Sequence, residues 1–165
     1  MPTDKGVATI ACQADAARAE RFMSECERAA STIQLDGAKP FDLGPGRDYV
    51  DRVNGAVDDV QTARGDGIDA LKGATTPAQQ ADAAAGVARA YGGAAKALDG
   101  DAVSPQVAAT NDAIVAALRD ASAAWGRVAD GAKSADAAGY KAGGRAVTKA
   151  EKQLSAALRQ LGQQS

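Results

Sequence analysis

The sequence predicts an all-α protein: an up-and-down antiparallel bundle of four to five helices, forming a single domain over residues 1–165. Three observations support this prediction. Alanine, the best helix former, accounts for 42 of the 165 residues. The other apolar residues recur at spacings of three and four, which places them on one face of a helix. No segment shows the alternation of a strand over a useful length, and residues 7–10 are the only short candidate.

The core of such a bundle must be built from few bulky side chains. Leu, Ile, Val and Phe total only 25 of 165 residues, a share low enough to be typical of disordered chains. Disorder also requires a high net charge, however, and the formal charge of this chain is −2. Because alanine lets helices pack closely, we expect a folded bundle with a thin core.

We expect five helices, with approximate bounds 12–34, 47–72, 77–99, 105–131 and 135–161. In the first helix, apolar or small residues over 12–33 alternate at spacings of four and three. The Gly- and Pro-rich stretch 36–46 is expected to be a loop. The second helix carries a stripe of valines, which Gly65 and Gly67 weaken, and it ends at Gly73.

The start of the third helix is the clearest local signal in the chain. Thr76 is a capping residue, Pro77 suits the first helical position, and Gln79 stands at the third. Ser104 followed by Pro105 opens the fourth helix by the same logic. Short connections follow the second, third and fourth helices, so sequential neighbours are expected to be antiparallel.

Composition argues against most enzymatic chemistry. The chain has no histidine, which excludes Ser-His and Cys-His nucleophile pairs and the Glu-x-x-His motifs of di-iron bundles. No Walker A sequence is present. We therefore expect a protein that is not an enzyme, with no cofactor and no tightly bound transition metal. The sequence pI of about 5.1 argues against a nucleic-acid binder, and no apolar stretch is long enough for a transmembrane segment.

Cys12 and Cys26 admit two interpretations. If one helix carries both, their separation of fourteen positions corresponds to about 21 Å, whereas a disulfide needs Cα atoms within about 7 Å. Both would then be small apolar residues of the first helix, as their spacing suggests. In the other interpretation Cys12 lies in a non-helical arm that folds back onto Cys26, and the two form a disulfide. An extracytoplasmic location would favour the disulfide.

A second candidate site surrounds the single tryptophan. In a hairpin that turns near Lys133, Trp125 faces the level of Gly143 and Gly144. The glycines either make room for the indole in a packed core or form, together with Tyr140, a possible ligand pocket.

Two polar features also have alternative interpretations. Asn111 occupies an inward position of the fourth helix, where it would fix the register of the bundle or contact a ligand. A basic row runs along the fifth helix and consists of Lys141, Arg145, Lys149, Lys152 and Arg159. Together with the acidic 36–72 region, this row indicates complementary solvated faces or a docking stripe for an acidic partner or anionic lipid.

Three features of the chain point to a resemblance: Cys12 and Cys26 in the first helix, the turn over 71–77, and the closing Ala-Leu pattern over 150–162. Together they resemble extracytoplasmic, alanine-rich helical proteins of high-GC Gram-positive bacteria, which are often tethered by a lipid or one membrane helix. Many such proteins have no assigned activity. The resemblance implies a bundle exposed outside the membrane and carries over no functional residue.

We therefore expect a non-enzymatic extracytoplasmic domain that binds a protein partner or a small ligand. It would be secreted or on the cell surface, with its export segment outside this chain, because residues 1–10 lack the apolar region of a signal peptide. One alternative is the sensory ectodomain of a membrane receptor, similar in size to four-helix chemoreceptor sensor domains. Another is a cytoplasmic amphipathic coat protein, similar in composition to phasins.

Overall fold

The chain divides into two compact units, Met1–Leu43 and Gly44–Ser165, where the sequence had suggested a single domain. The computed structural model describes residues 1–15, 18–41, 44–100 and 103–164. Most described residues are helical, so the predicted all-α class is confirmed. None of the described helices combines the length and the apolar character needed to cross a membrane.

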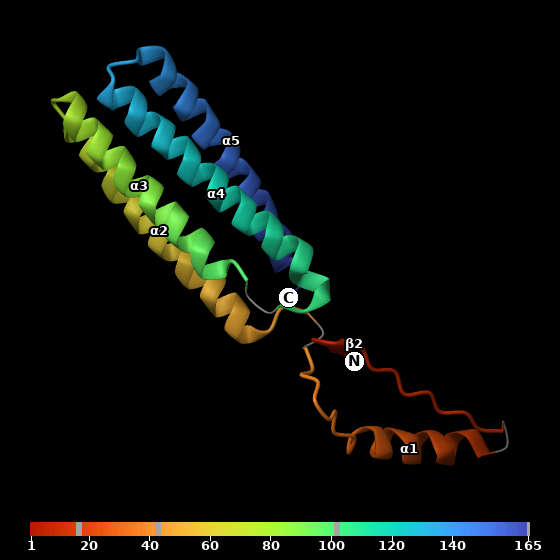
Figure 1. The fold of residues 1–165 in the computed structure, drawn as a ribbon. Coiled ribbons are helices and arrows are strands. Elements are labelled where there is room, and N and C mark those ends of the chain that lie inside the picture. Colours follow the sequence, from red (N-terminus) through yellow and green to blue (C-terminus); the bar gives the residue numbers. More distant parts are fainter. Residues whose placement is uncertain (16–17, 42–43, 101–102, 165) are drawn as a thin grey trace. The chain divides into compact units, whose positions relative to one another are not determined.

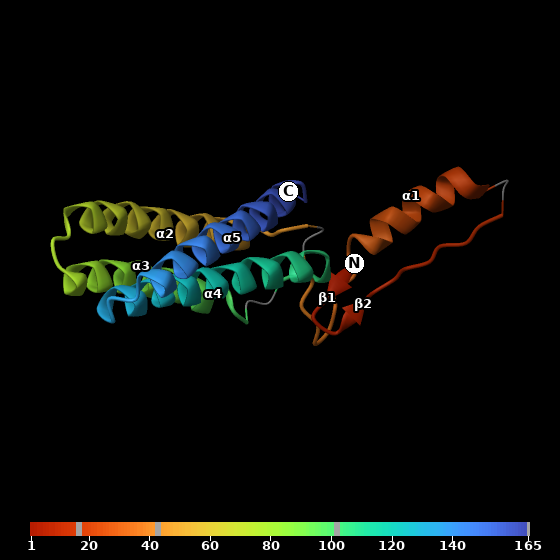
Figure 2. The same ribbon diagram turned by 90° about the horizontal axis from the view of Figure 1, so that it is seen from above.

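Unit 2 is an up-and-down bundle of four helices (Figures 1 and 2). They are α2 (Arg47–Gly73), α3 (Pro77–Leu98), α4 (Pro105–Lys133) and α5 (Ala137–Gly162). Packing is closest between sequential neighbours, α2 with α3, α3 with α4 and α4 with α5. The bounds lie within about two residues of the predicted ones, because the signals that start these helices are local.

The helix starts show those signals directly. The Thr76 hydroxyl accepts the backbone N–H of Gln79, and the Gln79 side chain accepts the N–H of Thr76 in return. Pro105 occupies the first turn of α4. The glycines inside α2 do not interrupt it: a Cβ on Gly67 would overlap the side chain of Val87, so this glycine lets α2 and α3 approach closely.

Alanine forms much of the core of unit 2, as expected for a thin one. Ala84, Ala121 and Ala124 have no exposed surface. Among the larger side chains that are fully buried are Tyr91, Leu98, Ile114 and Leu118. Helix α4 contributes more of the buried residues than any other helix and packs against both α3 and α5.

Both ends of unit 2 lie at the same end of the bundle, as four antiparallel helices require (Figure 1). A Cβ on Gly44 would stand 3.1 Å from the carbonyl oxygen of Gln164. Gly44 has a φ of +117°, which a residue with a side chain rarely adopts.

Unit 1 corrects three predictions. Strands β1 (Pro2–Thr3) and β2 (Gly6–Val7) form a small antiparallel hairpin where no sheet was expected. Helix α1 covers only Ala19–Ala30, not 12–34. Cys12 lies outside α1 and is disulfide-bonded to Cys26, with the Cα atoms 6.4 Å apart. The interpretation with both cysteines in one helix was therefore wrong.

The physical reason is that, among the described residues of unit 1, no other helix or strand packs closely against α1. Met23 and Ile33 belong to the apolar stripe of the predicted first helix, yet both are 47% exposed, and Phe22, outside that stripe, is 38% exposed. Helical spacing alone does not hold a long helix together in water; most helices depend on burying their apolar face. The disulfide and the strand pairing order this unit instead.

Candidate functional site

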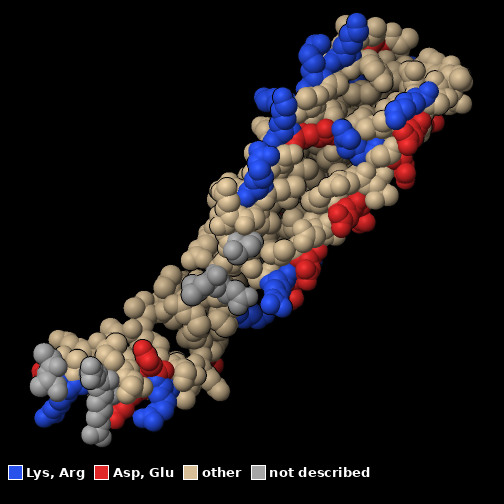
Figure 3. Space-filling view, turned by 180° about the vertical axis from the view of Figure 1, so that it is seen from behind, with Lys and Arg blue, Asp and Glu red and all other residues tan. Residues whose placement is uncertain are grey.

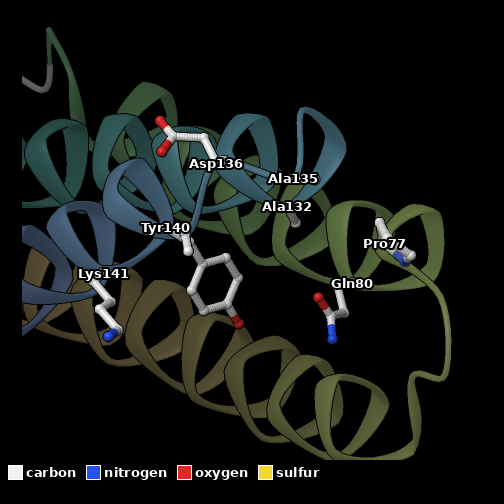
Figure 4. A pocket seen from close by; sticks show the side chains of 9 residues that line it. Pro77, Gln80, Ala132, Ala135, Asp136, Tyr140 and Lys141 are labelled. Carbon is white, nitrogen blue, oxygen red and sulfur yellow. The ribbon is translucent and has the colours of Figure 1, made fainter.

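A cavity of about 320 Å³ opens where α3 begins and α4 turns into α5 (Figure 4). Its lining consists of Pro77, Gln80, Gly131, Ala132, Ala135, Asp136, Ala137, Tyr140 and Lys141. Three helices and one turn therefore build it. Its volume is at the lower end of the range for small-molecule sites.

The α4–α5 turn gives this cavity a well-defined wall. The Asp136 carboxylate accepts the backbone N–H groups of Ala138 and Gly139, both at 3.0 Å, and so caps α5. The Asp136 N–H donates to the carbonyl of Gly131 at 2.8 Å. Gly131 is sterically required, since a Cβ there would stand 2.6 Å from the Tyr140 nitrogen. The close approach of the two helices positions Tyr140 at the mouth of the cavity.

Three polar side chains line this cavity beside Asp136. Figure 4 shows the Tyr140 ring extending from α5 toward Gln80 of α3, with Lys141 beside it on the same helix. Tyr140 and Gln80 are half-buried, and Lys141 is exposed. Within the described part of the chain, none of the three side chains has a hydrogen-bond or ion-pair partner. A phenol, an amide and an ammonium group are thus available beside walls of alanine, glycine and proline.

The four residues of the predicted pocket are placed differently. Tyr140 lines the cavity, but Trp125 is buried in α4 with only 7% of its surface exposed. Gly143 lies against α4 at Val128, where a Cβ would stand 2.9 Å from the backbone nitrogen. Gly144 is exposed. The glycine at 143 therefore makes room for the α4 backbone rather than for the indole.

Sequence reasoning missed Gln80 and assigned Lys141 to the basic row of the fifth helix rather than to this cavity. One available signal was the capping box at Thr76, which fixes the start of α3 and places Gln80 one turn into that helix. Nothing local, however, indicates that this turn meets the α4–α5 connection.

A polar network joins α2, α3 and α5 halfway along the bundle. Arg64 donates two hydrogen bonds to the Glu151 carboxylate, at 2.6 and 3.0 Å, and the Tyr91 hydroxyl donates to the same carboxylate at 2.9 Å. Burial raises the pKa of Tyr91, and the charge of Glu151 raises it further. The hydrogen bond with Glu151 also raises the pKa of Arg64. Tyr91 therefore stays protonated near neutral pH, and the network acts as a structural link.

Asn111 takes part in a second, fully buried link. Its side-chain oxygen accepts the Tyr49 hydroxyl at 3.0 Å, and its amide donates to the Leu98 carbonyl at 3.4 Å. These bonds connect α4 to α2 and to the end of α3. This arrangement agrees with a residue that fixes the register of the bundle.

The described residues contain no group of three or more His, Cys, Asp or Glu side chains placed to hold a metal ion. No protein family model matches the chain, and the searches of curated proteins and of solved structures give no match either.

Proposed function

We propose that this protein is a non-enzymatic extracytoplasmic binding domain whose cavity at the α4–α5 turn takes a small organic molecule with a carboxylate group. The observation that carries this proposal is that Tyr140, Gln80 and Lys141 line one cavity whose other walls are apolar except for Asp136, whose carboxylate caps α5. An aromatic ring provides apolar contact area, and an amide and a hydroxyl provide orienting hydrogen bonds. The unpaired Lys141 ammonium supplies the charge that a carboxylate requires.

The chemistry of the cavity supports binding rather than catalysis. Asp136, the acid in its lining, is engaged in capping α5. A general base must be free to accept a proton from the substrate. Among the described residues, no general base is hydrogen-bonded to Tyr140 or Lys141 to activate either one as a nucleophile, so the lining favours recognition.

The disulfide between Cys12 and Cys26 supports the extracytoplasmic location. Such bonds persist in oxidising compartments and are rare in reducing ones. The same bond weighs against the alternative of a cytoplasmic, phasin-like coat protein.

A sensory ectodomain is the second candidate function. The proximity of Gly44 and Gln164 supports it, because a sensor domain set between two membrane helices needs both of its ends on one side. In that role, ligand binding would move α5 relative to α2. Spin labels at Gln61 and Ser155, which are exposed on the two helices, would report a changed distance on adding ligand; an unchanged distance would argue against sensing.

The binding proposal is tested with benzoate as the simplest aromatic carboxylate and benzamide as its uncharged counterpart. We expect saturable binding of benzoate by ligand-observed NMR, and weaker binding of benzamide. Lys141→Gln should weaken benzoate binding by about tenfold or more, since a hydrogen bond to a charged group contributes about 1.5–3 kcal/mol. Ala137→Leu should block the cavity.

The matched control is Lys149→Gln, which removes the same charge from the same helix outside the cavity lining. It should bind benzoate like the wild type. Equal weakening in both lysine variants would show a nonspecific charge effect and contradict the proposal, as would the absence of binding across a panel of aromatic carboxylates.

A further inference from the structure

Helices α2 and α5 form a face of the bundle with two rows of opposite charge. The Arg64–Glu151 ion pair joins these helices across the face. Figure 3 shows Lys and Arg side chains gathered along the α5 edge and most of the acidic side chains along the opposite edge, where some Lys and Arg side chains also stand; few charged side chains lie between the two edges. Half-buried apolar residues lie on both helices, among them Val57, Ile68 and Leu158.

The basic row consists of Lys141, Arg145, Lys149, Lys152 and Arg159, all exposed. Among the described residues, none of the five has an acid within ion-pair distance. Glu151, the acid within α5, is engaged by Arg64 and Tyr91. Like charges at i, i+4 repel each other, so this row weakens α5 unless an anion meets it.

The row is also shaped to receive anionic side chains. Arg145, Lys149 and Lys152 surround a surface hollow of about 430 Å³, together with Thr148, Gln153 and Ala156. The small Ala156 and Thr148 leave space between the cations for a partner's carboxylate.

The acidic row on α2 consists of Asp51, Asp58, Asp59, Asp66 and Asp69, which are likewise exposed. Asp69 pairs with Lys72 of its own helix at 2.8 Å. The other four have no cation within ion-pair distance in the described part of the chain. Both rows extend over about 27 Å at 1.5 Å per helical residue.

The ion pair fixes the relative levels of the two rows. Because α2 and α5 are antiparallel, a step toward the C-terminus of α2 corresponds to a step toward the N-terminus of α5. Counted from Arg64 and Glu151, Asp66 lies level with Lys149, and Asp69 lies about one residue from Arg145. Asp58 lies between the levels of Lys152 and Arg159.

We propose that this face binds the same face of a second copy of the chain, forming a symmetric dimer. A two-fold axis parallel to the helices places α5 of one copy opposite α2 of the other without changing any residue's level, so both halves of the interface gain the same charge pairs. The apolar residues of the strip become the centre of the interface, and the charged rows become its rim.

A second copy fits this face better than an anionic membrane. A negatively charged surface that attracts the α5 row would repel the acidic row on the same face. A second copy neutralises both rows at once. The interaction is electrostatic at its rim, so it weakens with salt.

The experiment is a charge swap, measured by sedimentation velocity over a protein concentration series at about 0.05 M and about 0.5 M salt. Lys149→Asp with Lys152→Asp reverses the sign at the centre of the basic row and lowers its charge from +5 to +1; Asp58→Lys with Asp66→Lys does the same to the acidic row, from −5 to −1. We expect the wild type to dimerise and to weaken by about tenfold or more at the higher salt. Each double variant should be monomeric, whereas the two mixed together, or all four changes in one chain, should dimerise again.

Arg89→Asp with Lys96→Asp is the matched control, since it reverses two exposed cations on α3, outside this face. It should dimerise like the wild type, and circular dichroism should show that every variant is folded. A wild type that stays monomeric at low salt would overturn the proposal. The proposal would also be overturned if the control variant dimerised as weakly as the row variants, or if the fourfold variant failed to dimerise. A monomer that binds vesicles of phosphatidylglycerol but not of phosphatidylcholine would overturn it too.

Discussion

The two units of this protein use the same kind of helix in different ways. In unit 2 the apolar stripes face one another and bury residues such as Val53, Leu118 and Leu154. In unit 1 the apolar side chains Phe22 and Met23 of α1 remain partly exposed, and a disulfide ties the helix to the preceding segment. A stripe of apolar residues stabilises a helix only where another surface covers it. Where no such surface is available, a covalent bond takes over part of that role.

The comparison is tested most strongly by removing one large side chain from each unit. Trp125→Ala should lower the free energy of unfolding of unit 2 by about 3–5 kcal/mol, because it empties a buried site in a core with few bulky residues. Phe22→Ala in α1 should change stability by about 0.5 kcal/mol or less, since its ring is already partly in water. Urea unfolding followed by circular dichroism measures both. Similar losses in the two variants would refute the comparison.

Removing the disulfide should affect unit 1 alone. Replacing Cys12 and Cys26 by serine removes a link that closes a loop of about 15 residues, worth roughly 3 kcal/mol in the chain-entropy model. Hydrogen exchange over residues 1–41 should become fast. Trp125 is the single tryptophan and lies in unit 2, so its fluorescence melting curve should not move; a clear shift would mean that the two units are coupled.

The polar network of unit 2 predicts a specific loss of stability in alkali. The pKa of Tyr91 is raised by burial and by Glu151, so the unfolded chain loses this proton at a lower pH than the folded protein. The contribution is complete below about pH 10, the ordinary tyrosine value, and declines by at most about 1.4 kcal/mol per pH unit above it. Tyr91→Phe should lack this part of the decline. Parallel slopes for the two proteins in urea titrations at several pH values would contradict the assignment.

The helix caps give the smallest expected effect. Thr76→Ala removes the hydroxyl that accepts the Gln79 N–H and should cost about 1 kcal/mol. Helix α1 has no side-chain cap at Arg18. Side-chain capping therefore stabilises α3 in unit 2 but not α1 in unit 1. Thr75→Ala is the neighbouring comparison: its hydroxyl donates to Gln79 Oε1 but accepts no helix N–H, so this change should cost less than Thr76→Ala in the same thermal melts.

The sequence predicts the helices of unit 2 well and the structure of unit 1 poorly. The bounds of the helices of unit 2 could be predicted from the sequence because the signals that start them are local. Thr76 and Pro105 each determine a helix start within one turn of their own position. The bend that brings Cys12 to Cys26 could not, since it depends on contacts that spacing does not encode. Periodicity predicted a long first helix because it contains no information about what covers the apolar face.

The cavity was predictable only in part. Tyr140 was recognised, but Trp125 was paired with Gly143 although Val128, about one turn further along α4, lies there. The error comes from the turn: Gly131 lies against Tyr140, so the hairpin turns beyond Lys133, and Ala135 adopts a positive φ of 54°. Gln80 and Lys141 are 61 positions apart in the sequence, and only the tertiary packing reveals that they share a site.

The adjacency of Gly44 and Gln164 also determines how the bundle responds to mechanical tension. A force applied through these two residues pulls α2 and α5 apart from one end, one turn after another, rather than sliding them along each other. The first apolar layers separate early, and the opening then reaches the Arg64–Glu151 pair near the middle of both helices. The hydrogen bonds that Glu151 accepts from Arg64 and Tyr91 therefore break only after the turns nearest Gly44 and Gln164 have separated.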